Sequence, residues 1–175
     1  SEMETIQAAG IALDERLWVS PRCHVVMPYH PRVEAVYEHA KGKASTGTTG
    51  RGMGPVYADK VSYNGIRLAD LADEGVFAEK LRVQLELKNA LLRAYELEAL
   101  DFQPVLEEKL AQYARLRHVV REPFGLLQAA LRRGAEIVLE GAQGALLDND
   151  WGTYPFCTAS TTLAGGAAAG LGIAP

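Results

Sequence analysis

The sequence lacks an excess of basic residues, has only two cysteines and contains no long hydrophobic run. Its formal net charge of −4 argues against a general nucleic-acid or membrane-surface binder, because counterion release requires a basic face. A local basic pocket for a single phosphate is compatible with that charge. Cys23 and Cys157 fit no CxxC or zinc spacing, which favours two reduced thiols in a cytoplasmic protein.

Targeting patterns are also missing from the sequence. No charged segment followed by an apolar one stands at its start, so we expect no secretory signal. The apolar stretch 163–175 (LAGGAAAGLGIAP) is too short and too rich in glycine to span a bilayer. The opening SEMETIQAAG is typical of the end of a helix that stops at Gly10, and Pro175 falls within a glycine-rich run. We therefore expect a fragment of a longer protein.

Two short β-branched runs with a helical region between them predict the fold. Residues 24–27 (HVVM) and 136–141 (EIVLEG) have the pattern of buried strands. The second run leads directly into glycines and polar residues, as at the carboxyl edge of an open α/β sheet. From about residue 68 to residue 133 the apolar residues recur at helical spacing. We predict an α/β fold, part of an open, mainly parallel sheet with an inserted helical subdomain.

This organisation divides the chain into three segments. Residues 1–67 form a sheet-associated segment with the loop GTTGRGMGP, which we expect to bind a nucleotide phosphate. Residues 68–134 form the helical subdomain. Residues 135–175 form a strand followed by the loops EGAQG and GTYP of the nucleotide site.

The stretch 45–60 (STGTTGRGMGPVYADK) has a composition typical of backbone that binds an anion. It matches no standard phosphate loop, since the Walker pattern GxxxxGK[ST] from Gly47 fails after Gly52. The dinucleotide pattern GxGxxG from Gly50 fails at Pro55. The literal GTTG does match the loop with which KH domains clamp a nucleic-acid backbone, although four-residue matches are common by chance.

The threonines of this stretch suit a phosphate nevertheless. Thr48 and Thr49 offer hydroxyl donors flanked by glycines, so a phosphate can approach their backbone N–H groups without a Cβ in the way. Pro55 can begin a helix whose N-terminal dipole favours an anion. Lys60 lies about one and a half turns further on. A tight turn with solvated threonines explains the stretch equally well.

Two long motifs on either side of the helical region separate these interpretations. The sequences GTTGRGMGPVYADKVSYNGIRLADL (47–71) and LEGAQGALLDNDWGTYPFCTASTTLAGGAAAGLG (139–172) resemble adenylosuccinate synthetase. With ERLWVS and YH before them, the resemblance covers essentially the whole chain. It implies GTP-dependent ligation of IMP and aspartate in purine biosynthesis. In that reaction GTP phosphorylates the 6-oxygen of IMP and the aspartate amine displaces the phosphate, while Mg²⁺ and preorganised donors stabilise the transferred group.

The resemblance places IMP contacts at Thr49, Gln143 and Thr158, with Thr48 and Gly50 nearby. Thr49 and Thr158 would hold the 5′-phosphate from two separate loops. The amide of Gln143 would face the 6-position of the base, where it can donate to the developing phosphoryl oxygens. The ordinary alternatives are a loop cap for Gln143 and a turn hydroxyl for Thr158.

Two further positions belong to the family signature GPxYxxKxxR. Lys60 falls on its lysine and would lie near the active site, with a solvated cation as the alternative. Tyr63 stands where the family has an arginine that reaches across the dimer to the IMP phosphate of the other subunit. Tyrosine cannot supply a bidentate, charge-assisted pair. Departures such as Trp151 leave open a divergent relative that acts on a guanine nucleotide.

The motifs that carry the family's catalytic aspartate and histidine, resembling GDEGKGK and GHT, do not occur here. None of His24, His30, His39 and His118 lies in the acid's motif, so we expect them to be surface or structural residues. The aspartate-binding loop and most guanine contacts of the family lie beyond Pro175. We therefore expect no catalytic residue and no metal ligand in this chain, no GTP or Mg²⁺ bound by it alone, and no activity of the isolated chain.

The expected partners are IMP, aspartate, GTP and a second copy in a homodimer, without nucleic acid or membrane. The competing hypothesis is a non-catalytic domain that binds nucleic acid or a nucleotide through GTTG. A third is a dimerising remnant that binds nothing.

Overall fold

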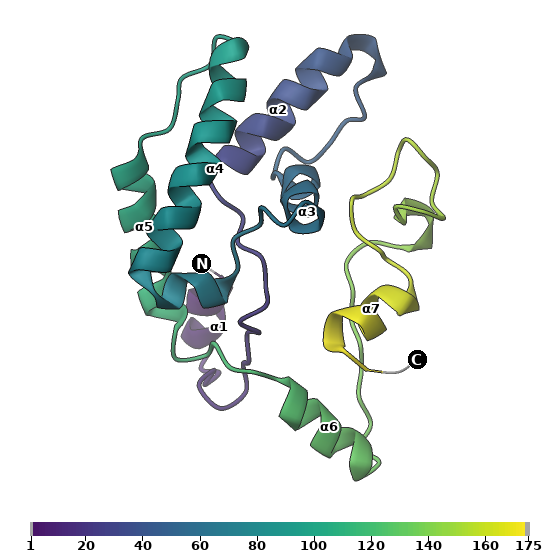
Figure 1. The fold of residues 1–175 in the computed structure, drawn as a ribbon. Helices are drawn as coiled ribbons and strands as arrows, with labels where there is room; N and C mark the ends of the chain where they lie inside the picture. The colour runs from purple at the N-terminus through teal and green to yellow at the C-terminus, as the bar shows by residue number, and fades with distance from the viewer. Residues whose placement is uncertain (1, 174–175) are drawn as a thin grey trace.

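The described part of the chain, residues 2–173 of a computed structural model, contains ten helical segments joined by loops, and no strand forms there (Figure 1). The α-helices are α1 (Glu2–Ala8), α2 (Tyr29–Lys41), α3 (Met53–Val61), α4 (Glu74–Ala94), α5 (Phe102–Leu116), α6 (Phe124–Arg132) and α7 (Ala164–Leu171). The 3₁₀ turns are η1 (Gly42–Ala44), η2 (Leu68–Ala72) and η3 (Ala145–Leu147). None of these helices is long and apolar enough to cross a membrane.

Helix α4 forms the centre of the packing. Its first turn is capped by Asp73, whose side chain accepts a hydrogen bond from the backbone N–H of Val76 at 3.0 Å. Phe77, Leu81 and Leu85 repeat at helical spacing within the region predicted to be helical, and all three are buried. They form the core with Met27, Tyr29, Ile66, Leu71, Val105 and Leu106. Helices α2 and α5 and the turn η2 thereby pack around α4.

A buried amide interrupts the apolar face of α4 and has its own packing role. The side chain of Asn89 is 7% exposed and donates to the backbone carbonyl of Leu100 at 2.9 Å. Its oxygen accepts from the backbone N–H of the same leucine at 2.8 Å. Asn89 thus satisfies both backbone groups of one residue and fixes the loop between α4 and α5.

The predicted sheet is not confirmed in the described residues. Residues 24–27 are extended and pair with the chain near Ile66, through an isolated antiparallel bridge between His24 and Arg67 and a 2.8 Å hydrogen bond from Val25 to Ile66. This contact involves too few residues to make a strand. Met27 is buried at the end of the segment, as predicted.

The burial predicted for residues 136–141 is not seen among the described residues, where Val138 is 91% exposed and Leu139 is 44% exposed. A strand of a parallel sheet is buried only when strands and helices cover it on both sides. No other strand lies beside this segment in the part of the chain that the structure describes.

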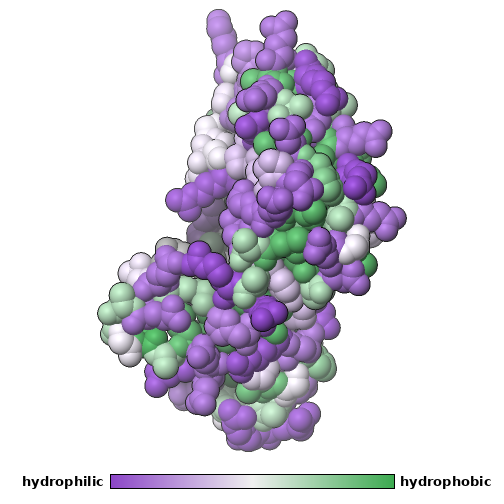
Figure 2. Space-filling model, turned by 90° about the vertical axis from the view of Figure 1, so that its left-hand side faces the viewer, coloured by the Kyte–Doolittle hydropathy of each residue, from purple (hydrophilic) through white to green (hydrophobic). Residues whose placement is uncertain are grey.

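The chain is arranged in two parts (Figure 1). Helices α2, α3, α4 and α5 lie together, and the segment that follows α6 runs along the side of this group and ends in α7. On the face shown in Figure 2, hydrophobic side chains reach the surface between hydrophilic ones. Cys23 and Cys157 are both free. The division at residues 67 and 134 stays a prediction.

Asn89→Ala should lower the free energy of unfolding by about 1–3 kcal/mol, because it leaves the N–H and carbonyl of Leu100 without their acceptor and donor. Urea unfolding followed by circular dichroism measures this difference. Glu86→Ala, on an exposed position of the same helix, serves as the control and should change stability by about 0.5 kcal/mol or less. Equal stabilities of the two variants would contradict the role given to Asn89.

Candidate functional site

The glycine-rich loop, residues 45–52, connects α2 to α3 and carries the first set of predicted phosphate contacts. Its backbone has positive φ at Gly47, Gly50 and Gly52, with values of 69°, 69° and 79°. Gly52 admits no side chain, since a Cβ there would lie 2.6 Å from the backbone of His30. The loop therefore returns to the surface of α2 before α3 begins.

Two glutamates of α2 hold the ends of this loop. Glu38 accepts hydrogen bonds from the backbone N–H groups of Thr46 and Gly47 at 2.9 and 3.0 Å. Glu34, which is 6% exposed, accepts one from the backbone N–H of Gly52 at 2.8 Å. Helix α2 thus fixes both the start and the end of the glycine-rich loop.

The middle of the loop is open to a ligand. Thr48, Thr49 and Gly50 are all exposed. A long hydrogen bond of 3.4 Å joins the backbone N–H of Gly50 to the hydroxyl oxygen of Thr48. Among the described residues, the backbone N–H groups of Thr48 and Thr49 donate to no acceptor of the chain. These donors are available to an anion.

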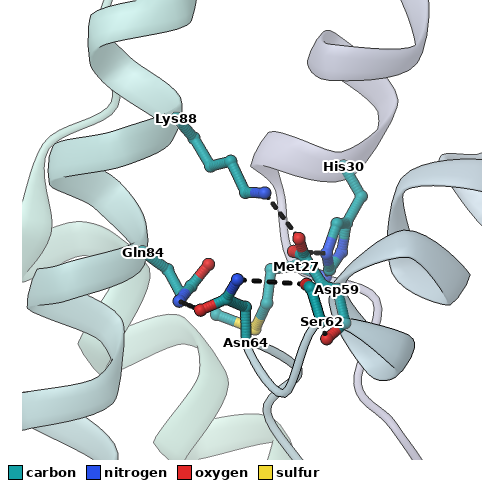
Figure 3. Close-up of polar contacts among 7 residues, drawn as sticks. All are labelled: Met27, His30, Asp59, Ser62, Asn64, Gln84 and Lys88. Carbon is teal, nitrogen blue, oxygen red and sulfur yellow. Dashed lines mark hydrogen bonds and ion pairs between the residues drawn. The ribbon is translucent and has the colours of Figure 1, made fainter.

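A buried polar network holds α3 in place behind the loop (Figure 3). Asp59 of α3 accepts a hydrogen bond from the ammonium of Lys88 of α4 at 2.5 Å. Its other oxygen lies 3.0 Å from Nε2 of His30 of α2. The backbone N–H of Met27 donates to Nδ1 of His30 at 2.8 Å, so the ring proton lies on Nε2 and points at Asp59. One carboxylate therefore connects three helices.

The network is structural rather than catalytic. Burial raises the pKa of Asp59, but hydrogen bonds from His30 and Lys88 outweigh it, so the pKa lies below its ordinary value of 3.8. The carboxylate is charged at neutral pH and cannot act as an acid there. Both ring nitrogens of His30 are engaged, and its side chain is buried. The sequence-based expectation of a surface or structural role for His30 agrees with this geometry.

A second buried carboxylate organises the loop between η3 and α7. Asp148 is fully buried, and its two oxygens accept four backbone hydrogen bonds, from Asp150, Trp151, Thr162 and Leu163 at 3.0, 3.1, 2.7 and 3.4 Å. Burial raises the pKa of Asp148, but these backbone donors outweigh it and the pKa lies below its ordinary value. Asp148 has no free oxygen to offer a metal ion.

The remaining predicted contacts lie on this second loop and the segment before it. Thr158 is half-buried, and its backbone N–H donates to the carbonyl of Leu147 at 2.8 Å. Gln143 is exposed and has a positive φ of 69°. Residues other than glycine adopt this conformation at a cost of about 1–2 kcal/mol, and such residues gather at functional sites.

The two family-signature positions are both exposed. The ammonium of Lys60 lies 5.4 Å from the centroid of the Tyr57 ring, a cation–π contact at the end of α3. Tyr63 is 96% exposed and has a positive φ of 64°. Its side chain therefore projects from the surface just beyond α3.

The comparisons with known proteins agree with these motifs. A family model described as adenylosuccinate synthetase matches residues 1–175. The chain belongs to the adenylosuccinate synthetase family. Adenylosuccinate synthetases of Aliivibrio fischeri and Halorhodospira halophila are each 46% identical over 99% of this chain. The structure of fully ligated adenylosuccinate synthetase from Plasmodium falciparum matches 99% of it with a TM-score of 0.84 and 32% identity.

The chain spans about 40% of the length of these adenylosuccinate synthetases. The match confirms the resemblance seen in the two motifs and favours it over a nucleic-acid clamp built on GTTG alone. The similarity to the Plasmodium falciparum enzyme supports the α/β class, although no sheet forms in the described residues.

The structure distributes the predicted IMP contacts over two loops. Thr48, Thr49 and Gly50 lie on the first loop, and Gln143 and Thr158 lie on the segment 141–163. No hydrogen bond or ion pair joins the two loops among the described residues, and each loop is held by its own carboxylate. That these residues converge on one nucleotide stays a prediction.

Sequence reasoning missed the residues that hold this site together. His30, Glu34 and Glu38 follow one another at four-residue spacing, which places them on one face of α2. The same four-residue spacing can be read from the sequence, as a polar repeat on α2. Asp148 lies within the second family motif, and its role in holding the loop is seen only in the structure. In the described residues, no group of three or more His, Cys, Asp or Glu is placed to hold a metal ion.

Asp59→Asn should lower the free energy of unfolding by about 3 kcal/mol at neutral pH, because it leaves Lys88 without a counterion at a nearly buried position. A lowered pKa stabilises the fold above the ordinary value of 3.8, and this contribution disappears as the pH falls through the lowered pKa. The difference between the two proteins should therefore shrink below about pH 4. Urea unfolding across this pH range measures it.

The control for this experiment is Asp101→Asn, an exposed carboxylate that makes no capping hydrogen bond. It should leave the stability within about 0.5 kcal/mol of the wild type. A stability loss in Asp59→Asn that stayed constant down to pH values near 2 would contradict the assignment.

Proposed function

We propose that this chain provides part of the IMP site of an adenylosuccinate synthetase, the enzyme that joins IMP to aspartate with GTP. The observation that carries the proposal is the pair of family motifs on two loops that expose hydrogen-bond donors. Each loop is shaped by a carboxylate that satisfies neighbouring backbone N–H groups, Glu38 in the first and Asp148 in the second. Within the described part of the first loop, the backbone N–H groups of Thr48 and Thr49 have no acceptor in the chain.

In this proposal Thr49 and Thr158 bind the 5′-phosphate and Gln143 binds near the 6-oxygen of the base. Hydroxyls and backbone N–H groups flanked by glycine suit a phosphate, because its oxygens can approach them closely. The amide of Gln143 can donate to phosphoryl oxygens as charge develops on them. The left-handed backbone at Gln143 supports a functional role for that position.

The catalytic acid and base, the aspartate site and most guanine contacts are assigned to parts of the enzyme that this sequence does not contain. GTP and Mg²⁺ belong to the proposal as ligands of the whole enzyme, in which Mg²⁺ neutralises charge on the transferred phosphoryl group. The described residues offer no cluster of carboxylates for it. We place the enzyme in the cytoplasm and expect a homodimer, as the resemblance to the family implies.

We also assign residues 136–141 to the sheet of the α/β fold. The segment has the composition of a buried strand, yet Val138 is exposed. Neighbouring strands in the remaining length of the enzyme would cover it, since this chain spans about 40% of its relatives. Such covering would also place the loop that follows, with Gln143, at the carboxyl edge of the sheet.

Thr49→Val should weaken IMP binding by about tenfold, because it removes a hydroxyl donor to a charged phosphate. Calorimetric titration with IMP measures the affinity. Glu86→Gln, at an exposed position of α4 outside both loops, serves as the control and should bind IMP like the wild type.

A parallel titration with single-stranded RNA at two salt concentrations tests the competing function. The IMP site requires discrimination between bases and a modest salt dependence. Steeply salt-dependent RNA binding, without detectable IMP binding, would overturn the proposal in favour of a nucleic-acid clamp.

Tyr63→Arg should tighten IMP binding by about ten- to a hundredfold in the dimeric enzyme, because arginine can form a bidentate pair with phosphate. Tyr63→Lys carries the same charge without the planar fork and should recover less of this gain. Titration with IMP compares the three proteins. Equal affinities would show that no group at position 63 reaches the phosphate.

A further inference from the structure

Five hydrogen-bond donors surround the carboxylate of Glu38. Its Oε1 accepts from the ammonium of Lys41 and the hydroxyl of Thr46, both at 2.7 Å. Its Oε2 accepts from the hydroxyl of Ser45 at 2.6 Å and from the backbone N–H groups of Thr46 and Gly47 at 2.9 and 3.0 Å. These donors lower the pKa of Glu38.

This donor set has the chemistry of an anion site. Successive backbone N–H groups, hydroxyls and an ammonium are the groups with which proteins bind phosphate and carboxylate. Here the first half of the loop folds around a carboxylate of the chain itself. The donors of Ser45, Thr46 and Gly47 are therefore occupied by Glu38 before any ligand binds.

Glu34 performs the same task at the other end of the loop. It lies one helical turn before Glu38, is nearly buried, and accepts the backbone N–H of Gly52. Between these two anchors only the segment 48–51 is left without support from α2. The outward-facing donors of Thr48 and Thr49 fall within this segment.

Helix α2, which carries the two glutamates, is itself held in place. His30 occupies the same face of α2, one turn before Glu34, and joins Asp59 of α3. Helix α3 begins directly after Gly52. The loop is thus fixed to α2 at both ends, while α2 and α3 are locked to each other by the buried network.

We propose that Glu38 and Glu34 are positioning residues of the phosphate loop, which shape it in the absence of ligand and direct the phosphate to Thr48 and Thr49. The inference rests on the proposed function, because it concerns the same phosphate. Neither glutamate touches the ligand. Their effect on affinity arises because a loop that is already ordered loses less conformational freedom on binding.

The direction in which a Glu38 substitution changes IMP affinity distinguishes a positioning role from simple electrostatic repulsion. A carboxylate near a phosphate repels it, so neutralising Glu38 would tighten IMP binding if charge were all that mattered. Removing a positioning residue weakens binding instead. Glu38→Gln keeps the size of the side chain and removes its charge, so the direction of the change in affinity is informative.

The first experiment measures hydrogen exchange in the full chain without nucleotide. Glu38→Gln should speed exchange of the Thr46 and Gly47 amides by about tenfold, since each loses a charged acceptor. Exchange in α4 should not change. Glu86→Gln, an exposed carboxylate on α4, is the matched control and should leave loop exchange unaltered. Unchanged exchange at both loop amides in Glu38→Gln would overturn the inference.

The second experiment measures IMP affinity of the same proteins by calorimetry. Glu38→Gln should bind IMP about tenfold more weakly than Glu86→Gln. Tighter or equal binding would overturn the inference. If the wild type bound no IMP while Glu38→Gln still loosened the loop, the proposed function would fail and the shaping of the loop by Glu38 would stand.

A donor-side variant covers the case in which Glu38→Gln does not fold. Ser45→Ala removes one hydroxyl donor to Glu38 from an exposed loop position. It should accelerate exchange of the Thr46 and Gly47 amides in the same direction and to a smaller extent. No acceleration in Ser45→Ala would count against the inference.

Discussion

The polar face of α2 is the constraint on which the candidate site depends. His30, Glu34 and Glu38 stand one turn apart, and each makes a different long-range contact, to α3, to the end of the glycine-rich loop and to its start. Because the three side chains share one rigid helix, the spacing between their contacts is fixed. The loop is therefore positioned by a helix as well as by its own glycines.

The two loops of the site are built on one principle, in which an acidic side chain satisfies the backbone N–H groups that a tight turn leaves unpaired. Glu38 does so from a neighbouring helix, and Asp148 does so from within its own loop. Hydrogen-bond donors lower the pKa of both carboxylates, mainly the side chains of Lys41, Ser45 and Thr46 for Glu38 and backbone N–H groups for Asp148. A loop ordered in this way can present its remaining donors to a ligand without first having to fold.

The fold was predictable where a local pattern decides it and was not where distant contacts do. The buried face of α4 follows from the helical spacing of its apolar residues Phe77, Leu81 and Leu85. The apolar run at 136–141 has the composition of a strand. A strand also needs neighbouring strands to pair with, and Val138 stays exposed in this chain. Sheet formation is a property of several segments together, so one segment cannot predict it with certainty.

By itself the sequence determined the helical region between about residues 68 and 133 and the family, because periodicity is local and the two motifs are long enough to identify their relatives. It also marked Thr49, Gln143 and Thr158 as candidates. Only the tertiary structure decided which carboxylates hold the loops, since Asp59 meets His30 and Lys88 from positions 29 residues away on either side. Such contacts depend on how the helices pack against one another, and no single stretch of the chain determines that packing.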